Sequence, residues 1–143
     1  MIFMDLNVGA VFLAAVATMV LGFLWYSPLL FARPWMKLMG YAPDDKTKLD
    51  EMRKEAAKLY GISFVTSLIS AIVLARILRL TISHTVLHGI RTGIGVWLGF
   101  VTTVQLTDKL FSNRPLQLYL INSGYQLLCY IAMGAILAAW PGN

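Results

Sequence analysis

Four long apolar stretches make up most of this chain. They lie at 8–30, 59–77, 92–107 and 116–140, and the first and last contain no charged side chain. The middle two are shorter, and each has arginines beside it that can extend to a membrane surface. A helix needs roughly 20 apolar residues to cross a hydrocarbon core about 30 Å thick. The pattern therefore predicts an all-α membrane protein, a bundle of four transmembrane helices at about 8–30, 59–79, 90–110 and 115–140.

The region between the first two stretches, 31–58, predicts two helices outside the membrane core. Pro34 and Gly40 bound a short apolar segment, and these residues are typical of a helix start and end, so we expect a short interfacial helix. An amphipathic pattern then continues into the second stretch and is weakened only at Gly61. We expect one helix over 45–79, on the order of 50 Å long, whose first turns extend into the cytoplasm. Two helices hinged at Gly61 are the alternative.

Composition and charge agree with a membrane protein. The chain has 143 residues, is 58% hydrophobic and 13% charged, and has a mean hydropathy of +0.69, whereas a soluble domain carries about 25% charged residues. Its length predicts a single domain, 1–143. Of its 12 Lys and Arg residues, nine lie after the first or third stretch and three lie around the loop after the second. This bias predicts that both termini lie outside the cytoplasm.

Small residues recur at four-residue spacing in three of the predicted spans. The stripes are Ala10, Ala14, Thr18 and Gly22; Ser63, Ser67, Ala71 and Ala75; and Gly95, Gly99, Thr103 and Thr107, with a further pair at Gly89 and Gly93. Such stripes let helix backbones approach closely in lipid. They predict a tight packing of the first three spans, with the fourth making a looser or intermolecular contact. A bundle this small also suggests a homo-oligomer, most simply a dimer.

Polar side chains in the third and fourth spans are the first candidates for a binding site, because polar groups at membrane depth are often functional. A tight turn near Asn113 would bring Gln105 level with Asn122 and Thr102 close to the level of Gln126. The predicted polar seam consists of Thr102, Gln105, Asp108, Asn122 and Gln126. It would form a solute or ion path or a lipid head-group pocket. The alternative is a set of interhelical hydrogen bonds that fixes the register of the two helices.

Other candidates are weaker. Arg76, Arg79 and Arg91 could contact an anionic lipid at the outer rim, or they could simply extend to the membrane surface. His84 and His88 share a helical face, but two ligands are too few for zinc, so no metal site or other cofactor is expected. No nucleophile with a neighbouring base and no phosphate-binding glycine loop is present, so no enzyme is expected. Acidic residues interrupt the basic first loop, which argues against a nucleic-acid partner.

Several short blocks resemble the signature of one family. They are 22–28 with its Trp25-Tyr26-Ser27-Pro28 element, then Phe31, Trp35 and Gly40, the block 97–100, Asp108 and Phe111, and the segments 122–125 and 134–140. In these the chain resembles a bacterial membrane-protein family catalogued as domain of unknown function 1761. The resemblance implies a small four-span protein of the bacterial inner (cytoplasmic) membrane. It points to Trp25, Tyr26, Ser27, Pro28, Trp35 and Asp108, and it implies no activity.

Two functions fit the sequence. The first is a small transporter, channel or lipid-binding module that uses the polar seam, with membrane lipids as partners. The alternative is a structural or accessory membrane protein that docks a partner through the amphipathic helix of the first loop.

Overall fold

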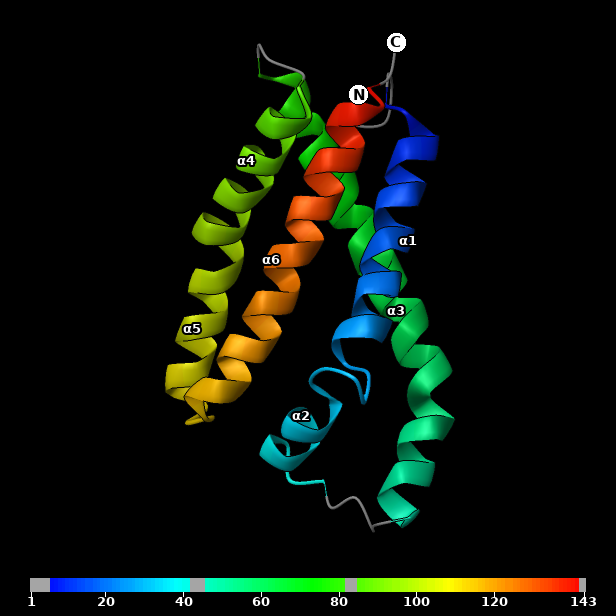
Figure 1. Cartoon of the computed structure of the whole chain (residues 1–143), viewed down its shortest axis with the longest axis vertical. Helices are drawn as coiled ribbons and strands as arrows, with labels where there is room; N and C mark the ends of the chain where they lie inside the picture. Colours follow the sequence, from blue (N-terminus) through cyan, green and yellow to red (C-terminus); the bar gives the residue numbers. More distant parts are fainter. Residues whose placement is uncertain (1–5, 42–45, 82–84, 142–143) are drawn as a thin grey trace.

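Every element of the described chain is helical. The computed structural model describes residues 6–41, 46–81 and 85–141. Its elements are α1 (Val8–Trp25), α2 (Ala32–Leu38), α3 (Lys46–Arg79), α4 (Val86–Val96), the π-helix η1 (Trp97–Val101), α5 (Thr102–Phe111) and α6 (Leu116–Ala139). Figure 1 shows α6 in the middle, with α1 and α3 on one side and α4 and α5 on the other. His84 and Asp45 lie outside the described residues.

Three of these helices, α1, α3 and α6, are long and apolar enough to cross a membrane. Three of the four predicted spans are thus confirmed in length and composition, whereas the third stretch is not one helix of this kind. The reason is local: η1 follows α4 and α5 follows η1 without a gap, so a π turn divides the third stretch into shorter pieces.

The long second helix is confirmed. α3 continues through Gly61, so the hinged alternative is wrong. Ser67 of α3 lies level with Thr18 of α1, because their hydroxyl oxygens are 2.8 Å apart. α1 ends at Trp25, so the first turns of α3 extend beyond it by about 20 Å at 1.5 Å per residue. Figure 1 shows this projecting part of α3 beside α2.

The small-residue stripes of the first and second spans lie where helices meet. Ala10 and Ala14 of α1 and Ala71 of α3 are fully buried. Thr18 donates its hydroxyl to Ser67, which links the two stripes directly. Small side chains let the backbones of α1 and α3 approach closely, so the prediction of close packing is confirmed for these two stripes.

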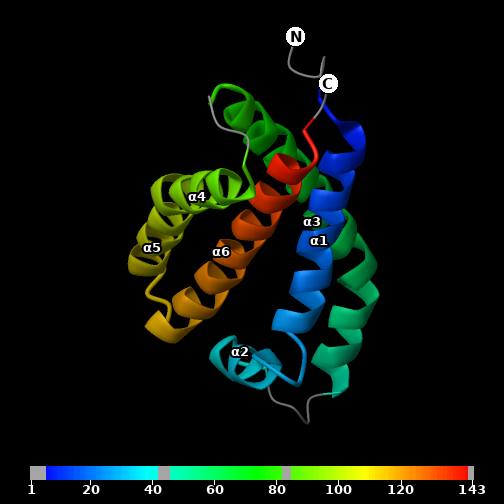
Figure 2. The same ribbon diagram turned by 45° about the horizontal axis from the view of Figure 1, so that its top comes forward.

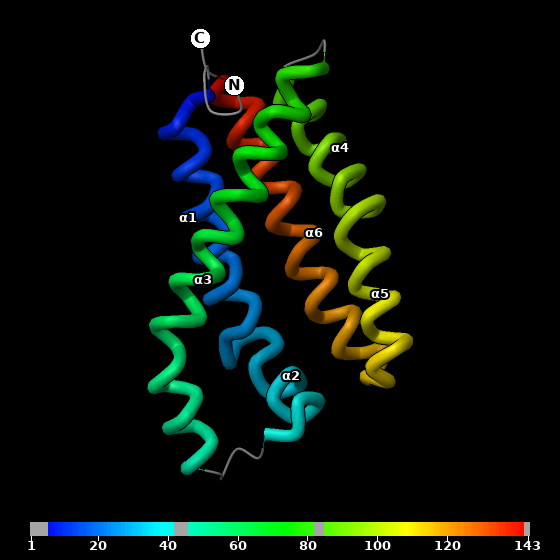
Figure 3. The backbone as a smooth tube through the Cα atoms, turned by 180° about the vertical axis from the view of Figure 1, so that it is seen from behind, coloured from blue at the N-terminus to red at the C-terminus, as the bar shows by residue number. Residues whose placement is uncertain are grey.

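The fourth predicted span is the centre of the fold, which corrects the expectation of a loose helix. α6 contacts α1, α2, α3, α4, η1 and α5. The C-terminal half of α6 carries buried side chains such as Cys129, Met133 and Leu137 in the main hydrophobic core. Figure 3 shows α3 crossing α6 near the end where the chain termini lie and separating from it toward the other end. The centre is therefore α6, and not the first three predicted spans.

Glycines bring α4 and α6 into backbone contact. A Cβ added to Gly89 would meet the carbonyl oxygen of Gly134, and one added to Gly93 would meet the carbonyl oxygen of Tyr130. The longer stripe of the third span points elsewhere: Gly95 and its successors in that stripe are exposed. The prediction that this stripe packs inside the protein is therefore wrong, and the pair Gly89 and Gly93 packs there instead.

The molecule has two unlike ends. At one end, called here the rim, α1 begins and α3 and α6 finish (Figure 1). At the opposite end, called here the loop end, α2 lies across the molecule beneath α6 (Figure 2). The helix predicted between Pro34 and Gly40 is thus confirmed as α2, and Gly40, with a φ of 82°, ends it in a left-handed conformation that glycine adopts without strain.

Candidate functional site

Two tryptophans from different helices bind the backbone of one segment of α6. Trp25, the last residue of α1, donates its indole N–H to the carbonyl oxygen of Ile121 over 2.9 Å. Trp97, the first residue of η1, donates its indole N–H to the carbonyl oxygen of Ser123, also over 2.9 Å. We call residues 119–126 of α6 the α6 junction, since side chains from two other elements converge on it.

The tyrosines of this region hold the end of α1 against the α6 junction. Tyr26 donates its hydroxyl to the side-chain oxygen of Asn122 over 2.7 Å. Tyr125 donates its hydroxyl to the carbonyl oxygen of Thr18 over 2.8 Å. The rings of Tyr26 and Tyr125 also meet edge to face, with centroids 5.3 Å apart. These bonds give the partly buried polar groups at the contact between α1 and α6 partners within the protein.

Thr102 completes the junction from the other side. Its hydroxyl oxygen lies 2.6 Å from that of Tyr119 and 2.7 Å from that of Ser123. Trp97 and Thr102 are five residues apart, and in a regular α-helix they would lie about 140° apart around the axis. The wider π turn, closed by the bond from the Thr102 N–H to the Trp97 carbonyl, brings both onto the face toward α6.

The five residues of the predicted polar seam do not form one continuous site. Thr102 and Asn122 both belong to the α6 junction, but they take part in separate contacts. Thr102 of α5 binds Ser123 of α6, whereas Asn122 of α6 binds Tyr26 on the side of α1. Gln126 is half-buried on α6, and the Gln105 side-chain oxygen is buried with no hydrogen-bond partner in the described part of the chain. Asp108 is exposed and lines a shallow hollow of about 410 Å³ with Thr103, Val104 and Thr107.

The register of the seam also differs from the prediction. Thr102 meets Tyr119 and Ser123, which lie about two and one helical turns, respectively, from the expected level of Gln126. The link between α5 and α6 explains this shift. It contains Asn113 at a positive φ of 51° and an extended Pro115, so the two helices need not leave the turn at equal heights.

The Trp-Tyr-Ser-Pro element forms the turn that follows α1. The Ser27 hydroxyl donates to the carbonyl oxygen of Leu24 over 2.7 Å, and Pro28 is exposed. Phe31 packs against Trp25 with ring centroids 4.5 Å apart. Trp35 of α2 then meets Tyr26 at 5.9 Å, so this motif connects α1 and α2 to the α6 junction.

Sequence reasoning missed four members of the junction, Trp97, Tyr119, Ser123 and Tyr125. Each was hidden for a physical reason. Trp97 sits in a π turn that no simple period reveals, and the other three fit the composition of any membrane helix. One signal was available, because the blocks 97–100 and 122–125 belong to the same signature as Trp25, and the structure brings all three together.

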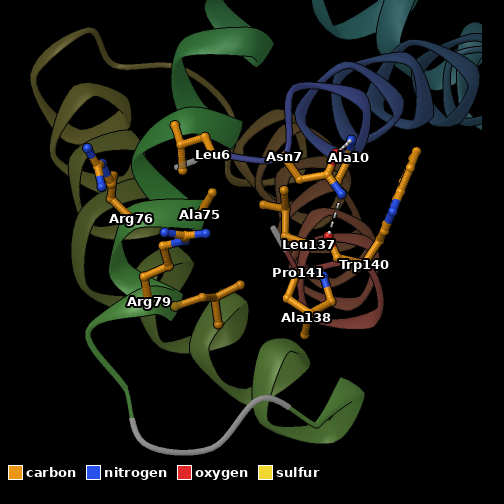
Figure 4. A pocket seen from close by; sticks show the side chains of 11 residues that line it. Leu6, Asn7, Ala10, Ala75, Arg76, Arg79, Leu137, Ala138, Trp140 and Pro141 are labelled. Atoms are coloured by element: carbon orange, nitrogen blue, oxygen red, sulfur yellow. Dashed lines mark hydrogen bonds between the residues drawn. The ribbon is translucent and has the colours of Figure 1, made fainter. Parts of the chain in front are cut away.

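A cavity lies at the rim, between α1, α3 and α6. It has a volume of about 590 Å³ and is lined by Leu6, Asn7, Ala10, Ala75, Arg76, Leu78, Arg79, Leu137, Ala138, Trp140 and Pro141. Figure 4 shows Arg76 and Arg79 on one side of it, with Asn7 and Trp140 on the other. Arg91, the third arginine predicted to contact lipid, does not line this rim cavity and is exposed on α4.

The rim cavity combines positive charge with apolar walls. Within the described ranges no acidic residue lines it, and its remaining lining is mostly aliphatic. Asn7 is held in place: its amide donates to the carbonyl oxygen of Trp140 over 3.1 Å, and its side-chain oxygen accepts from the Ala10 N–H. Ligand sites typically have volumes of about 300–1,000 Å³, so a molecule larger than water fits here.

Metal-ligating side chains do not form a cluster within the described ranges. Within residues 6–41, 46–81 and 85–141, no group of three or more His, Cys, Asp or Glu residues could hold a metal ion. Cys129 is buried in the core beside Tyr125, and the Nε2 of His88 is buried with no hydrogen-bond partner among the described residues.

One comparison with known proteins gives a match. The sequence model of a family described as Protein of unknown function (DUF1761) matches residues 9–138, which is most of the chain. No curated protein and no solved structure matches. The match covers α1 through nearly all of α6, and so it includes the α6 junction and part of the rim cavity.

Proposed function

We propose that this chain, which belongs to the DUF1761 family, is a lipid-binding membrane protein that holds a membrane amphiphile in the rim cavity. The observation that carries the proposal is the combination of two arginines, a positioned asparagine and apolar walls around about 590 Å³. Small-molecule sites have this character, with a few polar groups in a mostly apolar lining.

Four crossings of the membrane are part of this proposal. α1, α3 and α6 each have the required length. α4, η1 and α5 run without a break from Val86 to Phe111, about 40 Å at 1.5 Å per residue, so the third stretch can span the core as one divided helix. A π turn inside a membrane helix is tolerated where a neighbouring helix covers it, as α6 does here.

The location and orientation follow from the charge bias. We place the protein in the inner membrane with the rim outside and the loop end, which carries most of the lysines and arginines, in the cytoplasm. The predicted homo-oligomer stays a prediction.

The α6 junction is less suited than the rim cavity to conduct or bind a solute. The hydroxyls of Thr102, Ser123 and Tyr119 bind one another, and Asn122 binds Tyr26, so these side chains already have protein partners. Asp108 faces outward, away from this network. The junction therefore supports the alternative weighed for the seam, in which hydrogen bonds fix helix register.

Native mass spectrometry of the detergent-purified protein tests lipid binding in the rim cavity. We expect one phospholipid to stay bound after exchange into a non-ionic detergent. A Leu6→Trp variant should lose this lipid, because its larger ring would fill part of the cavity. The matched control is Val8→Trp, since Val8 is 74% exposed and does not line the cavity.

Three results would contradict the proposal: no retained lipid in the unmodified protein, equal retention in Leu6→Trp, or equal loss in both variants. Thermal unfolding of both variants in the same detergent shows whether a loss of lipid comes from a loss of fold.

A second candidate function rests on α3. Its first turns project beyond α1, and the described residues 46–58 are almost all exposed and carry charges of both signs. This end suits an accessory protein that docks a cytoplasmic partner. Exchanging Arg53, Lys54 and Lys58 for glutamate should abolish co-purification of such a partner while the helix content stays unchanged. If the same proteins co-purify with both forms, the accessory function is wrong.

A further inference from the structure

The rim cavity selects for charge, and this inference rests on the proposed function. We propose that its ligand is an anionic glycerophospholipid, with the phosphate beside Arg76 and Arg79 and the glycerol and first acyl carbons against the apolar wall. The sequence predicted Arg76, Arg79 and Arg91 as a group of lipid contacts; the geometry divides this group and gives the first two a pocket.

The spacing of the two arginines on α3 makes a shared ligand feasible. Arg76 and Arg79 are three residues apart in the last turn of α3, so they lie on one side of the helix, and both line the cavity. Figure 4 shows the two side chains on the same wall of the cavity. A guanidinium has five N–H donors in a planar fork, so it can bind a phosphate oxygen pair and still keep a partner within the chain.

The electrostatics of the cavity favour an anion over a zwitterion. Among the residues that the structure describes, the lining holds two positive side chains and no acidic one. A zwitterionic head group would bring its own cation into this positive field, whereas a phosphatidylglycerol head group would not. Arginines in a last helical turn also stabilise the partial negative charge of the helix end. That role requires no cavity, so it does not account for the space beside them.

The aliphatic part of the lining explains why a lipid fits better than a free phosphate ion. Leu6, Leu137 and Ala138 present aliphatic surface to the cavity, and burying hydrocarbon against it is favourable in a protein surrounded by lipid and water at the rim. Trp140 is 52% exposed beside this wall, which is the usual position of a tryptophan at a membrane interface. A free phosphate would leave this wall unused.

Competition between two lipids tests the inference. The full-length protein, in non-ionic detergent, is titrated with phosphatidylglycerol and phosphatidylcholine of identical acyl chains, and bound lipid is quantified by native mass spectrometry. We expect the unmodified protein to prefer phosphatidylglycerol by about tenfold or more, because two charge-assisted contacts are made. The double variant Arg76→Gln/Arg79→Gln should lose this preference. Arg91→Gln, the matched control, should retain it.

A second pair of substitutions covers the case in which the double variant does not fold. Arg76→Lys/Arg79→Lys keeps both charges but removes the planar forks. It should retain a preference for phosphatidylglycerol that is weaker than in the unmodified protein. Thermal unfolding in the same detergent gives the folded fraction of every variant.

The outcomes separate the two proposals. Equal binding of both lipids, lost in Leu6→Trp, would overturn the anionic assignment and leave lipid binding in place. No binding of either lipid would overturn both. An equal loss of preference in Arg91→Gln would show a general surface attraction and overturn the assignment to the cavity. Displacement of phosphatidylglycerol by excess inorganic phosphate at constant ionic strength would overturn the lipid in favour of a free anion.

Discussion

The two halves of α6 are held by different means. In the half toward the rim, Gly134 and the Tyr130 backbone meet glycines of α4, and the contact is between main chains. In the half toward the loop end, the α6 junction is held by side-chain hydrogen bonds from Trp25, Trp97 and Thr102. The difference shows two ways in which helices are held together, by close approach of their main chains in one place and by polar contacts in another.

The largest effect is expected where main chains touch. In Gly93→Ala the new Cβ would meet the Tyr130 carbonyl oxygen, so α4 must move away from α6. We expect the free energy of unfolding to fall by about 3 kcal/mol or more. SDS titration in mixed micelles, followed by circular dichroism, measures it.

The control for this prediction lies on the same helix. A Cβ added to Gly95 meets no atom within 4 Å, so Gly95→Ala should leave the free energy of unfolding unchanged or raise it by at most about 1 kcal/mol. Equal destabilisation by both substitutions would mean that the α4–α6 contact is not the source of the effect.

Tryptophan substitutions at the α6 junction should cost less. Trp97→Phe removes the indole N–H that binds the Ser123 carbonyl but keeps most of the ring. We expect a loss of about 1 kcal/mol in the free energy of unfolding, within the range found for hydrogen bonds between membrane helices. The same titration checks it. Trp140→Phe at the rim, where the ring is 52% exposed, is the comparison and should change stability less.

The smallest effect is expected at Thr102. Thr102→Val removes a hydroxyl shared with Tyr119 and Ser123, and we expect a loss of about 0.6 kcal/mol. Thr103→Val is the matched control, since Thr103 is exposed and its hydroxyl donates to the carbonyl oxygen of Gly99 in η1 rather than to α6. A double-mutant cycle with Ser123→Ala measures the coupling between the two hydroxyls; a coupling of zero would contradict the junction as described.

Some of this architecture could be predicted because one local rule decided it. The amphipathic pattern before Gly61 continues into an apolar stretch with no strong breaker, and α3 follows as one helix. Likewise, Thr18 and Ser67 meet because a four-residue spacing keeps small residues on one helical face.

The rest depended on choices that spacing cannot make. The third stretch has two sets of small residues with the same period, and only the fold shows that Gly89 and Gly93 face α6. The predicted seam failed for a related reason. Gln105 and Asn122 seemed level if the turn were symmetrical, but the contact of Thr102 with Tyr119 and Ser123 gives a different register. The rim cavity is lined by residues from three distant segments, so no single sequence motif could predict it.

The π turn at η1 has a consequence for the sequences that relatives can have at this turn. A π turn contains one residue more than a regular helix needs, so removing one residue between Trp97 and Thr102 would restore an α-helix without shortening its reach much. The two flanking side chains would then be four residues apart, about 40° apart around the axis, so both could still face α6. A relative that is one residue shorter here should thus keep both its tryptophan and its threonine, whereas a relative of equal length with a regular α-helix here should have exchanged one of them.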